Sequence, residues 1–314
     1  MISVVMSIYK TKKEYILEAV ESILNQTYSN FEFIIINNGS DKQIDNLLLS
    51  FNDKRIIILR TEEVVTLYES RTIGIKSSKN DWVALMDADD ISLPERFSSQ
   101  LSFLKENSDL KIGCIGTYAR YLNEKSEVIG HRISRPTSVS EHEEMRVSHE
   151  AIITTDPSAI INKNVFLEAG GYRADYSPAA DLDLWYRVVE KGYLVLTLPE
   201  YYFYYRIHKD ADSTSKFMLQ RKKTHFANMN MERRRKNLLE IDYEHFCNKY
   251  WSSFSYKFPR MWRNYAKYYY KKAGLSYLNK NYIGVIFFLI PAVLFNPFYV
   301  INRVLSHKFK AKSL

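Results

Sequence analysis

The chain has 314 residues, a length of about two average domains or one large α/β domain with an extension. Hydrophobic residues make up 46% of it, enough for a sizeable core. The net charge of +8 and the pI near 9.1 favour polyanions, diphosphates or an anionic membrane as partners, without choosing among them. Its two cysteines, Cys114 and Cys247, form no CxxC motif, and no histidines stand at zinc-site spacing. Reduced thiols in a cytosolic protein are therefore expected.

Short apolar, β-branched runs alternate with helical segments through the first part of the chain. Residues 1–10 turn polar too soon for a signal peptide and predict a first strand. The segments that follow predict helix, strand, helix, strand, helix and strand in turn, at 14–26, 31–37, 45–51, 55–59, 70–80 and 81–86. This alternation is typical of an α/β protein with a mostly parallel sheet and helices on its faces.

Polar residues follow three of the predicted strands. Tyr9 comes after the first strand, residues 37–40 (NNGS) after the second, and residues 87–90 (DADD) after the strand at 81–86. In open α/β sheets ligands bind beyond the carboxyl ends of the strands, so we expect these residues to meet at one rim. Loops are polar in most proteins, and the grouping alone does not distinguish a site from ordinary loop surface.

The DADD stretch places three carboxylates within four residues: Asp87, Asp89 and Asp90. Asp87 and Asp89 can present oxygens to one divalent cation, or to the diphosphate that it binds, if the loop turns. Hard oxygen ligands of this kind suit Mg²⁺ or Mn²⁺. The alternative is that Asp89 or Asp90 caps a helix that begins near residues 93–100. Capping would explain one aspartate but not three.

A second acidic group lies within residues 177–193. Asp181 stands at the start of a predicted helix whose apolar stripe includes Leu184 and Trp185. There it could act as a general base that accepts a proton from an incoming hydroxyl. Spacing alone favours the alternative, an N-cap role. Asp183 is more simply a first-turn residue that the helix dipole favours.

Five stretches of the sequence occur in the order and spacing of the family 2 glycosyltransferases, bacterial inverting enzymes of the GT-A fold. They are residues 3–10, 19–40, 70–90, 170–192 and 204–214. Each motif is weak alone, whereas five in order are specific. The resemblance covers about residues 1–215 and implies a GT-A catalytic domain there, a Rossmann-like, mostly parallel sheet flanked by helices.

The resemblance also implies a reaction. A sugar is moved from a nucleotide-diphosphate donor to an acceptor hydroxyl, with inversion at the anomeric carbon. Charge that develops on the leaving diphosphate is of the kind that a divalent metal, Mn²⁺ or Mg²⁺, neutralises. The family's donor and metal contacts map onto Asp87 and Asp89, and its base maps onto Asp181 in preference to the capping role. One acidic motif set implies one transferase site.

Four further roles follow from the resemblance. Tyr9 matches an aromatic residue near the base and ribose, and Arg71 matches an arginine that reaches the nucleotide. His208 matches the histidine that follows the YR pair of the family. A lone histidine is more often an ordinary surface residue, but near a diphosphate it could ligate metal or hold phosphate. Asn38 replaces the aspartate that accepts the uracil N3 proton. An amide carbonyl can also accept that proton, so a UDP-sugar remains the expected donor.

Other departures from the family pattern fall at Ala180, where relatives carry a carboxylate on the acceptor side, and at Lys10 and Thr72. None of them touches the proposed metal or base. We therefore expect an active enzyme with altered donor or acceptor recognition.

The composition changes near Ser215, where we place a domain boundary. Residues 216–314 are predicted to be helical, basic and rich in aromatic residues. Residues 282–301 are about long enough to span a bilayer but contain two prolines and an asparagine. This favours docking on the inner membrane face through a kinked segment over a single span. The alternative is that these residues pack against the catalytic domain as its last helices.

The expected partners are a nucleotide-sugar donor, a glycan or polyprenyl-diphosphate-linked acceptor, and the cytoplasmic face of the inner membrane. The product would be a surface polysaccharide such as capsule or O-antigen. Two alternatives stay open. Nucleic-acid binding through the basic, aromatic residues 216–272 leaves the DADD cluster unexplained. A catalytically silent sugar-nucleotide scaffold is suggested by the substitutions at Asn37, Asn38 and Ala180.

Overall fold

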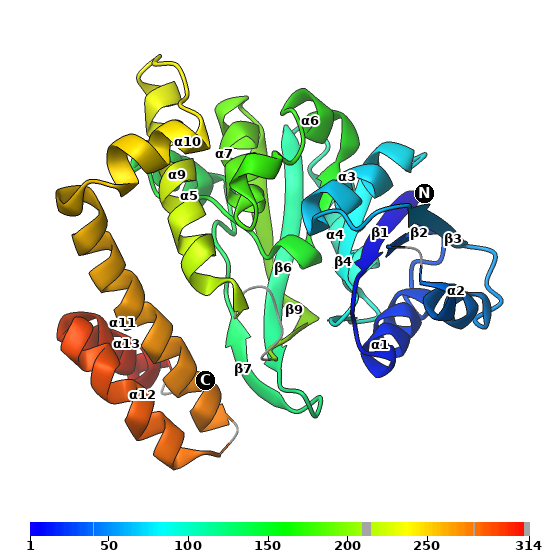
Figure 1. Cartoon of the computed structure of the whole chain (residues 1–314). Helices are drawn as coiled ribbons and strands as arrows, with labels where there is room; N and C mark the ends of the chain where they lie inside the picture. The colour runs from blue at the N-terminus through cyan, green and yellow to red at the C-terminus, as the bar shows by residue number, and fades with distance from the viewer. Residues whose placement is uncertain (40, 209–214, 279, 311–314) are drawn as a thin grey trace. The chain divides into compact units, whose positions relative to one another are not determined.

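The computed structural model describes residues 1–39, 41–208, 215–278 and 280–310. The chain forms two compact units, Met1–His208 and Lys209–Leu314 (Figure 1). The boundary that the sequence predicts near Ser215 adjoins residues 209–214, which lie outside the described residues together with Ser40 of the NNGS stretch.

The first unit is built on one sheet. Its strands are β1 (Ile2–Ile8), β2 (Phe31–Asn38), β3 (Ile56–Thr61), β4 (Trp82–Asp87), β5 (Ile91–Ser92), β6 (Ile112–Leu122), β7 (Val128–Arg132), β8 (Ile160–Asn162) and β9 (Leu194–Arg206). They lie in the order β3-β2-β1-β4-β8-β6-β9-β5, with β7 paired to β6. The four strands predicted from the sequence, β1 to β4, are parallel neighbours, which confirms the α/β expectation. The other half of the sheet is mixed, because β8 runs antiparallel to β4 and β6 while β9 is parallel to β6.

Helices cover both faces of this sheet (Figure 1). They are α1 (Lys13–Leu24), α2 (Lys42–Leu49), α3 (Leu67–Ser77), α4 (Arg96–Glu106), α5 (Val139–Val147), α6 (Lys163–Glu168) and α7 (Ala180–Glu190), with short 3₁₀ turns η1 (Asp156–Ser158) and η2 (Ala174–Tyr176). Alternate residues of a strand point to opposite faces. Val4 and Met6 of β1 accordingly join the core under α1, α2 and α4, whereas Val5 joins the core under α3, α6 and α7.

The carboxyl ends of the parallel strands lie at one edge, as the sequence predicts. Ile8 of β1 pairs in register with Asn37 of β2, and Ser7 pairs with Asp87 of β4. The residues that follow these strands therefore emerge beside one another. This edge carries Tyr9, Asn38 and the DADD stretch.

Helix α3 lies unusually close to the sheet because residue 74 is glycine. A Cβ atom there would stand 2.5 Å from Cγ1 of Val5 and 2.8 Å from Cδ1 of Ile36. The helix starts at Leu67, earlier than the predicted 70–80, with Thr66 and Glu69 forming a capping box. Since α3 also carries Arg71, its close approach fixes the height of that side chain above the sheet.

The second unit is helical, as predicted. It contains α9 (Phe217–Arg235), α10 (Tyr243–His245), a π-helical turn (Phe246–Trp251), α11 (Phe254–Leu278), α12 (Tyr282–Phe295) and α13 (Pro297–Lys310). Phe295 of α12 packs its ring against Trp262 and Tyr265 of α11, at 4.7 and 5.3 Å between centroids. Because α12 ends at Phe295 and α13 begins at Pro297, the apolar stretch 282–301 is divided between two helices at Asn296. Across the described residues, every helix is too short or too polar to cross a bilayer.

Gly74→Ala tests how closely α3 packs on the sheet. The added methyl group must push against Val5 and Ile36, so unfolding in urea should become easier by about 1–3 kcal/mol. Ser77→Ala on the exposed side of the same helix is the control and should change stability by less than about 0.5 kcal/mol. Equal stability of the two variants would show that the close approach has no energetic consequence.

Candidate active site

The three aspartates of the DADD stretch converge at the end of β4. Carboxylate oxygens of Asp87, Asp89 and Asp90 lie within 4.8 Å of one another. The capping alternative for Asp89 or Asp90 is wrong, because α4 begins at Arg96 and the residue at its N-cap, Glu95, makes no side-chain capping bond. The cluster is therefore not a by-product of helix initiation.

Asp90 is the buried member of the cluster. Its Oδ1 accepts a hydrogen bond of 2.8 Å from the backbone N–H of Arg206, whereas its Oδ2 is buried and meets no hydrogen-bond donor among the described residues. Burial, with the charges of Asp89 and Asp87, raises the pKa of Asp90 well above its ordinary value. An uncompensated carboxylate oxygen beside two further carboxylates suits a divalent cation, so these residues fit Mg²⁺ or Mn²⁺.

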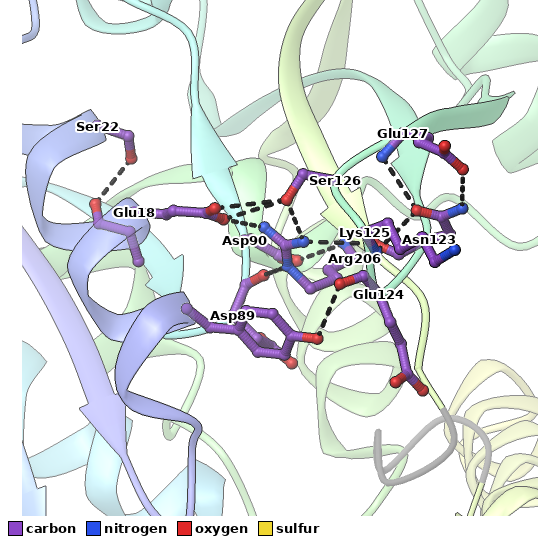
Figure 2. Close-up of polar contacts among 12 residues, drawn as sticks. Glu18, Ser22, Asp89, Asp90, Asn123, Glu124, Lys125, Ser126, Glu127 and Arg206 are labelled. Atoms are coloured by element: carbon purple, nitrogen blue, oxygen red, sulfur yellow. Dashed lines mark hydrogen bonds and ion pairs between the residues drawn. The ribbon is translucent and has the colours of Figure 1, made fainter.

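Arg206, the last residue of β9, holds the turn that carries these aspartates (Figure 2). Its Nε donates to the backbone carbonyl of Asp89 at 2.8 Å and its Nη1 donates to Oγ of Ser126 at 2.8 Å. It also forms an ion pair with Glu18 of α1. The guanidinium is fully buried, so it positions the turn without facing solvent. Sequence reasoning assigned no role to this arginine beyond its place in a motif.

His208 follows the end of β9 and lies beside the cluster. Its Nε2 is 2.8 Å from Oδ2 of Asp89, and its Nδ1 is buried without a hydrogen-bond partner in the described part of the chain. The structure thus brings together Asp89 and His208, the two residues predicted to bind the metal. Their role in binding metal stays a prediction. The remainder of that motif, residues 209–214, lies outside the described residues.

Arg71 lies between two carboxylates. One terminal nitrogen pairs with Asp87 and the other with Asp156, and only 2% of the side chain is exposed. Contact with a nucleotide, which the resemblance implies for Arg71, stays a prediction, since the protein itself engages both ends of the guanidinium. Asp156, on the turn η1, was missed by sequence reasoning. Nothing in the TTDPS stretch distinguishes it from an ordinary turn acid.

Two tyrosines extend this network to the predicted base. The hydroxyl of Tyr172 donates to Asp156 at 3.2 Å, and its ring lies 4.9 Å from the ring of Tyr68. Tyr68, one turn before Arg71 on α3, donates through its hydroxyl to Oδ1 of Asp181 at 3.3 Å. Two hydrogen bonds and one ring contact therefore connect Asp156, beside Arg71, with Asp181.

Asp181 is the second residue of α7 and not its N-cap. The N-cap is Ala179, whose side chain makes no capping bond, so the capping alternative for Asp181 is wrong. Burial raises the pKa of Asp181 above its ordinary value, although the side chain stays partly exposed. Asp183 has a stronger structural role than the helix dipole implies, because it is fully buried and paired with Arg173 and Arg187.

Tyr9 and Asn38 differ in solvent exposure. Tyr9 is 44% exposed, with the amine of Lys10 5.1 Å from its ring centroid. Asn38 is buried, and its Oδ1 already accepts hydrogen bonds of 3.0 Å from Thr61 and from the backbone N–H of Val65. Its Nδ2 donates to the carbonyl of Val65 at 2.8 Å. The base contact expected of Asn38 stays a prediction.

Comparison of the sequence with known proteins finds glycosyltransferases. The family model described as Glycosyl transferase family 2 matches residues 3–169. The O-antigen biosynthesis glycosyltransferase WbnJ of Escherichia coli is 31% identical over 223 residues, which are 68% of this chain and 83% of WbnJ. The UDP-Glc:alpha-D-GlcNAc-diphosphoundecaprenol beta-1,3-glucosyltransferase WfaP of Escherichia coli is 25% identical over 217 residues, 69% of this chain and 81% of WfaP.

Among solved structures, S. aureus TarS 1–349 in complex with UDP-GlcNAc has a TM-score of 0.57, covering 92% of this chain and 90% of that one. At 13% identity this likeness shows a shared fold alone. The family model spans more than half of the chain, and the motifs that it covers include the acidic strand end described above. The chain belongs to glycosyltransferase family 2 and is a glycosyltransferase.

Proposed function

We propose that this enzyme moves a sugar from a UDP-sugar to a hydroxyl of a glycan or lipid-linked acceptor, with inversion, in the synthesis of a surface polysaccharide such as capsule or O-antigen. The observation that carries the proposal is the three-carboxylate cluster at the carboxyl ends of parallel strands, with a separate partly exposed carboxylate, Asp181, nearby. TarS, which shares the fold, was solved with UDP-GlcNAc, and the names of WbnJ and WfaP specify O-antigen biosynthesis and a diphosphoundecaprenol acceptor.

The donor is bound at the acidic strand end in this proposal. Asp87, Asp89 and His208 would hold Mn²⁺ or Mg²⁺. When bound, such an ion supplies positive charge that offsets the negative charge developing on the leaving nucleoside diphosphate. The exposed ring of Tyr9 offers a stacking surface for the base or ribose. Asn38 holds residues 61–65 in place, because its Oδ1 accepts hydrogen bonds from Thr61 and Val65.

The acceptor is activated by Asp181. As the acceptor oxygen attacks the anomeric carbon, Asp181 takes its proton, and the electron pair of the broken bond leaves with the diphosphate oxygen. Burial raises the pKa of Asp181, which makes it a stronger base than a fully solvated carboxylate. The hydroxyl of Tyr68 orients the carboxylate through the 3.3 Å hydrogen bond to Oδ1.

The nucleotide specificity and the metal requirement are tested together by thermal unfolding with UDP, GDP, CDP or dTDP, each with Mn²⁺ or with EDTA. A ligand that binds only the folded state raises the melting temperature, so UDP with Mn²⁺ should raise it and EDTA should remove the effect. Asp89→Asn should abolish the shift. Asp53→Asn breaks a comparable ion pair with Arg55 away from the site and should retain it.

A shift with GDP, CDP or dTDP in place of UDP would contradict the donor assignment. A shift that survives EDTA would contradict the metal assignment. Normal binding with no sugar transfer to any acceptor and no donor hydrolysis would favour the scaffold alternative.

Asp181→Asn separates binding from chemistry. The amide cannot accept the acceptor proton, so the turnover number should fall by about 10²–10⁴-fold. The Mn²⁺-dependent shift with UDP should be unchanged, because Asp181 lies on the acceptor side. Turnover within a few-fold of the wild type would show that another group removes the proton.

We also propose that the enzyme works at the cytoplasmic face of the inner membrane, through its second unit. One face of α12 is apolar and exposed, and α13 also carries exposed apolar side chains. On α12 the exposed apolar residues fall at the i, i+3, i+4, i+7 and i+11 positions of one helix face, and two more stand three residues apart on α13: Ile283, Ile286, Phe287, Ile290 and Leu294, then Phe298 and Ile301. Residues 209–314 carry 21 Lys and Arg against six Asp and Glu. An apolar face on a basic unit is complementary to an anionic bilayer.

A second hydrophobic feature of this unit supports the same location. A pocket of about 390 Å³ is lined mainly by aromatic side chains of α11 and Phe295 of α12. Phe254, Phe258 and Trp262 of its lining are also exposed. Aromatic and basic side chains together are typical of surfaces that sit at a membrane interface.

Ile286→Asp with Ile290→Asp tests the membrane surface. Two charges on the apolar face should lower binding to vesicles of phosphatidylglycerol by at least about tenfold, without changing the UDP response in solution. Leu239→Asp is the matched control, since Leu239 is 87% exposed but lies outside that face. Wild-type binding by the double variant, or equal binding to neutral phosphatidylcholine vesicles, would contradict the proposal.

A further inference from the structure

We propose that Asp156 is a positioning residue for the divalent cation of the transfer site: it shares the Arg71 guanidinium with Asp87, and so keeps part of the Asp87 negative charge available to the ion. The inference rests on the proposed function and adds a residue to it. Asp156 would not touch the cation, the donor or the acceptor. It would act through Arg71.

The geometry gives the two carboxylates unequal positions. Asp87 ends β4 at the acidic cluster and is partly exposed, whereas Asp156 is only 7% exposed. Each pairs with a different terminal nitrogen of the same guanidinium. Arg71 is buried, so solvent does little to weaken either attraction. One positive charge is therefore divided between an acid at the cluster and an acid behind it.

Asp156 has little freedom to move away. The hydroxyl of Tyr172 donates to its two carboxylate oxygens at 3.2 and 3.4 Å. The Tyr172 ring packs in turn against Tyr68 at 4.9 Å and Phe166 at 5.3 Å. The planar guanidinium of Arg71 has a fixed fork geometry, so holding one arm orients the other. Fixing Asp156 thus fixes the arm that reaches Asp87.

The arrangement has an electrostatic consequence. If Asp156 lost its charge, the full positive charge of Arg71 would act on Asp87 and on the cation beside it. Asp87 would then attract a divalent ion less strongly. At distances of several ångströms and the effective dielectric constant of a protein, one unit charge changes such an affinity by about tenfold or more.

Two substitutions of Asp156 distinguish the effect of its charge from the effect of its size. Asp156→Asn keeps the size and removes the charge, whereas Asp156→Glu keeps the charge and changes the size. Mn²⁺ is titrated into each protein at pH 8, above the Asp156 pKa of about 7, in the presence of UDP. The shift in melting temperature is followed alongside the rate of transfer. Asp156→Asn should need about tenfold more Mn²⁺ for the half-maximal shift, and Asp156→Glu should stay within about threefold of the wild type.

A role in packing alone would give the opposite order, since the isosteric Asn is then the milder change. Equal Mn²⁺ dependence of Asp156→Asn and the wild type would overturn the inference, as would a Glu variant as impaired as the Asn variant. The response of the wild type distinguishes failure of the role of Asp156 from failure of the proposed function itself. An Mn²⁺-dependent UDP response in the wild type that Asp156→Asn leaves intact overturns only the role of Asp156, whereas no such response in the wild type overturns both.

The melting temperature of Asp156→Asn at a chosen pH distinguishes weaker cation binding from a general loss of folding. Burial raises the pKa of Asp156 to about 7, with Arg71 opposing the effect. Between its unfolded value near 3.8 and about 7, the folded state binds the proton more tightly, so the carboxylate's contribution to stability falls as pH rises through that interval. At pH 8 burial disfavours the ionised carboxylate, which offsets part of the loss of the Arg71 ion pair, so Asp156→Asn should melt within a few degrees of the wild type. A much lower melting temperature would show that the carboxylate is needed for folding, which would contradict a role confined to the cation site.

Discussion

Repulsion among three carboxylates at the end of one strand is the constraint around which the catalytic unit is built. Asp87, Asp89 and Asp90 approach within 4.8 Å, and residues 87–95 contain no lysine or arginine. Two buried arginines from distant parts of the chain flank the cluster. Arg71 pairs with Asp87. Arg206 donates through Nε to the backbone carbonyl of Asp89 and through its backbone N–H to the carboxylate of Asp90. These contacts hold the acids in place but leave an oxygen of Asp90 without a donor among the described residues.

The two units carry net charges of opposite sign, although the chain as a whole is basic. Residues 1–208 carry 30 Asp and Glu against 23 Lys and Arg, so the excess of positive charge comes from residues 209–314. An acidic catalytic unit has electrostatic reason to recruit a divalent cation before it binds a diphosphate. A strongly basic helical unit with an exposed apolar face is suited to an anionic membrane. The acidic catalytic unit also weakens the nucleic-acid alternative, because it would repel a polyanion.

Much of this fold could be predicted from the sequence because the signals are local. The first four strands are short apolar runs, and the DADD stretch follows one of them directly. The partners of the charged residues could not be predicted in the same way. Arg71 and Asp156 are 85 positions apart, and their contact depends on how closely α3 packs on the sheet. The pairing of Asp183 with Arg173 and Arg187 likewise depends on the packing of α7. The strands of the mixed half of the sheet were missed for a related reason, since their pairing is decided by tertiary contacts.

The central claim is that the acidic strand end holds a divalent ion together with a nucleoside diphosphate. The most direct measurement is an anomalous difference map at the manganese edge from crystals grown with UDP and Mn²⁺. The account predicts one strong peak in coordination distance of the carboxylate oxygens of Asp89, with the UDP diphosphate on its other side. UDP bound at the carboxyl ends of β1, β2 and β4, with no manganese peak within reach of Asp87, Asp89 or His208, would contradict it.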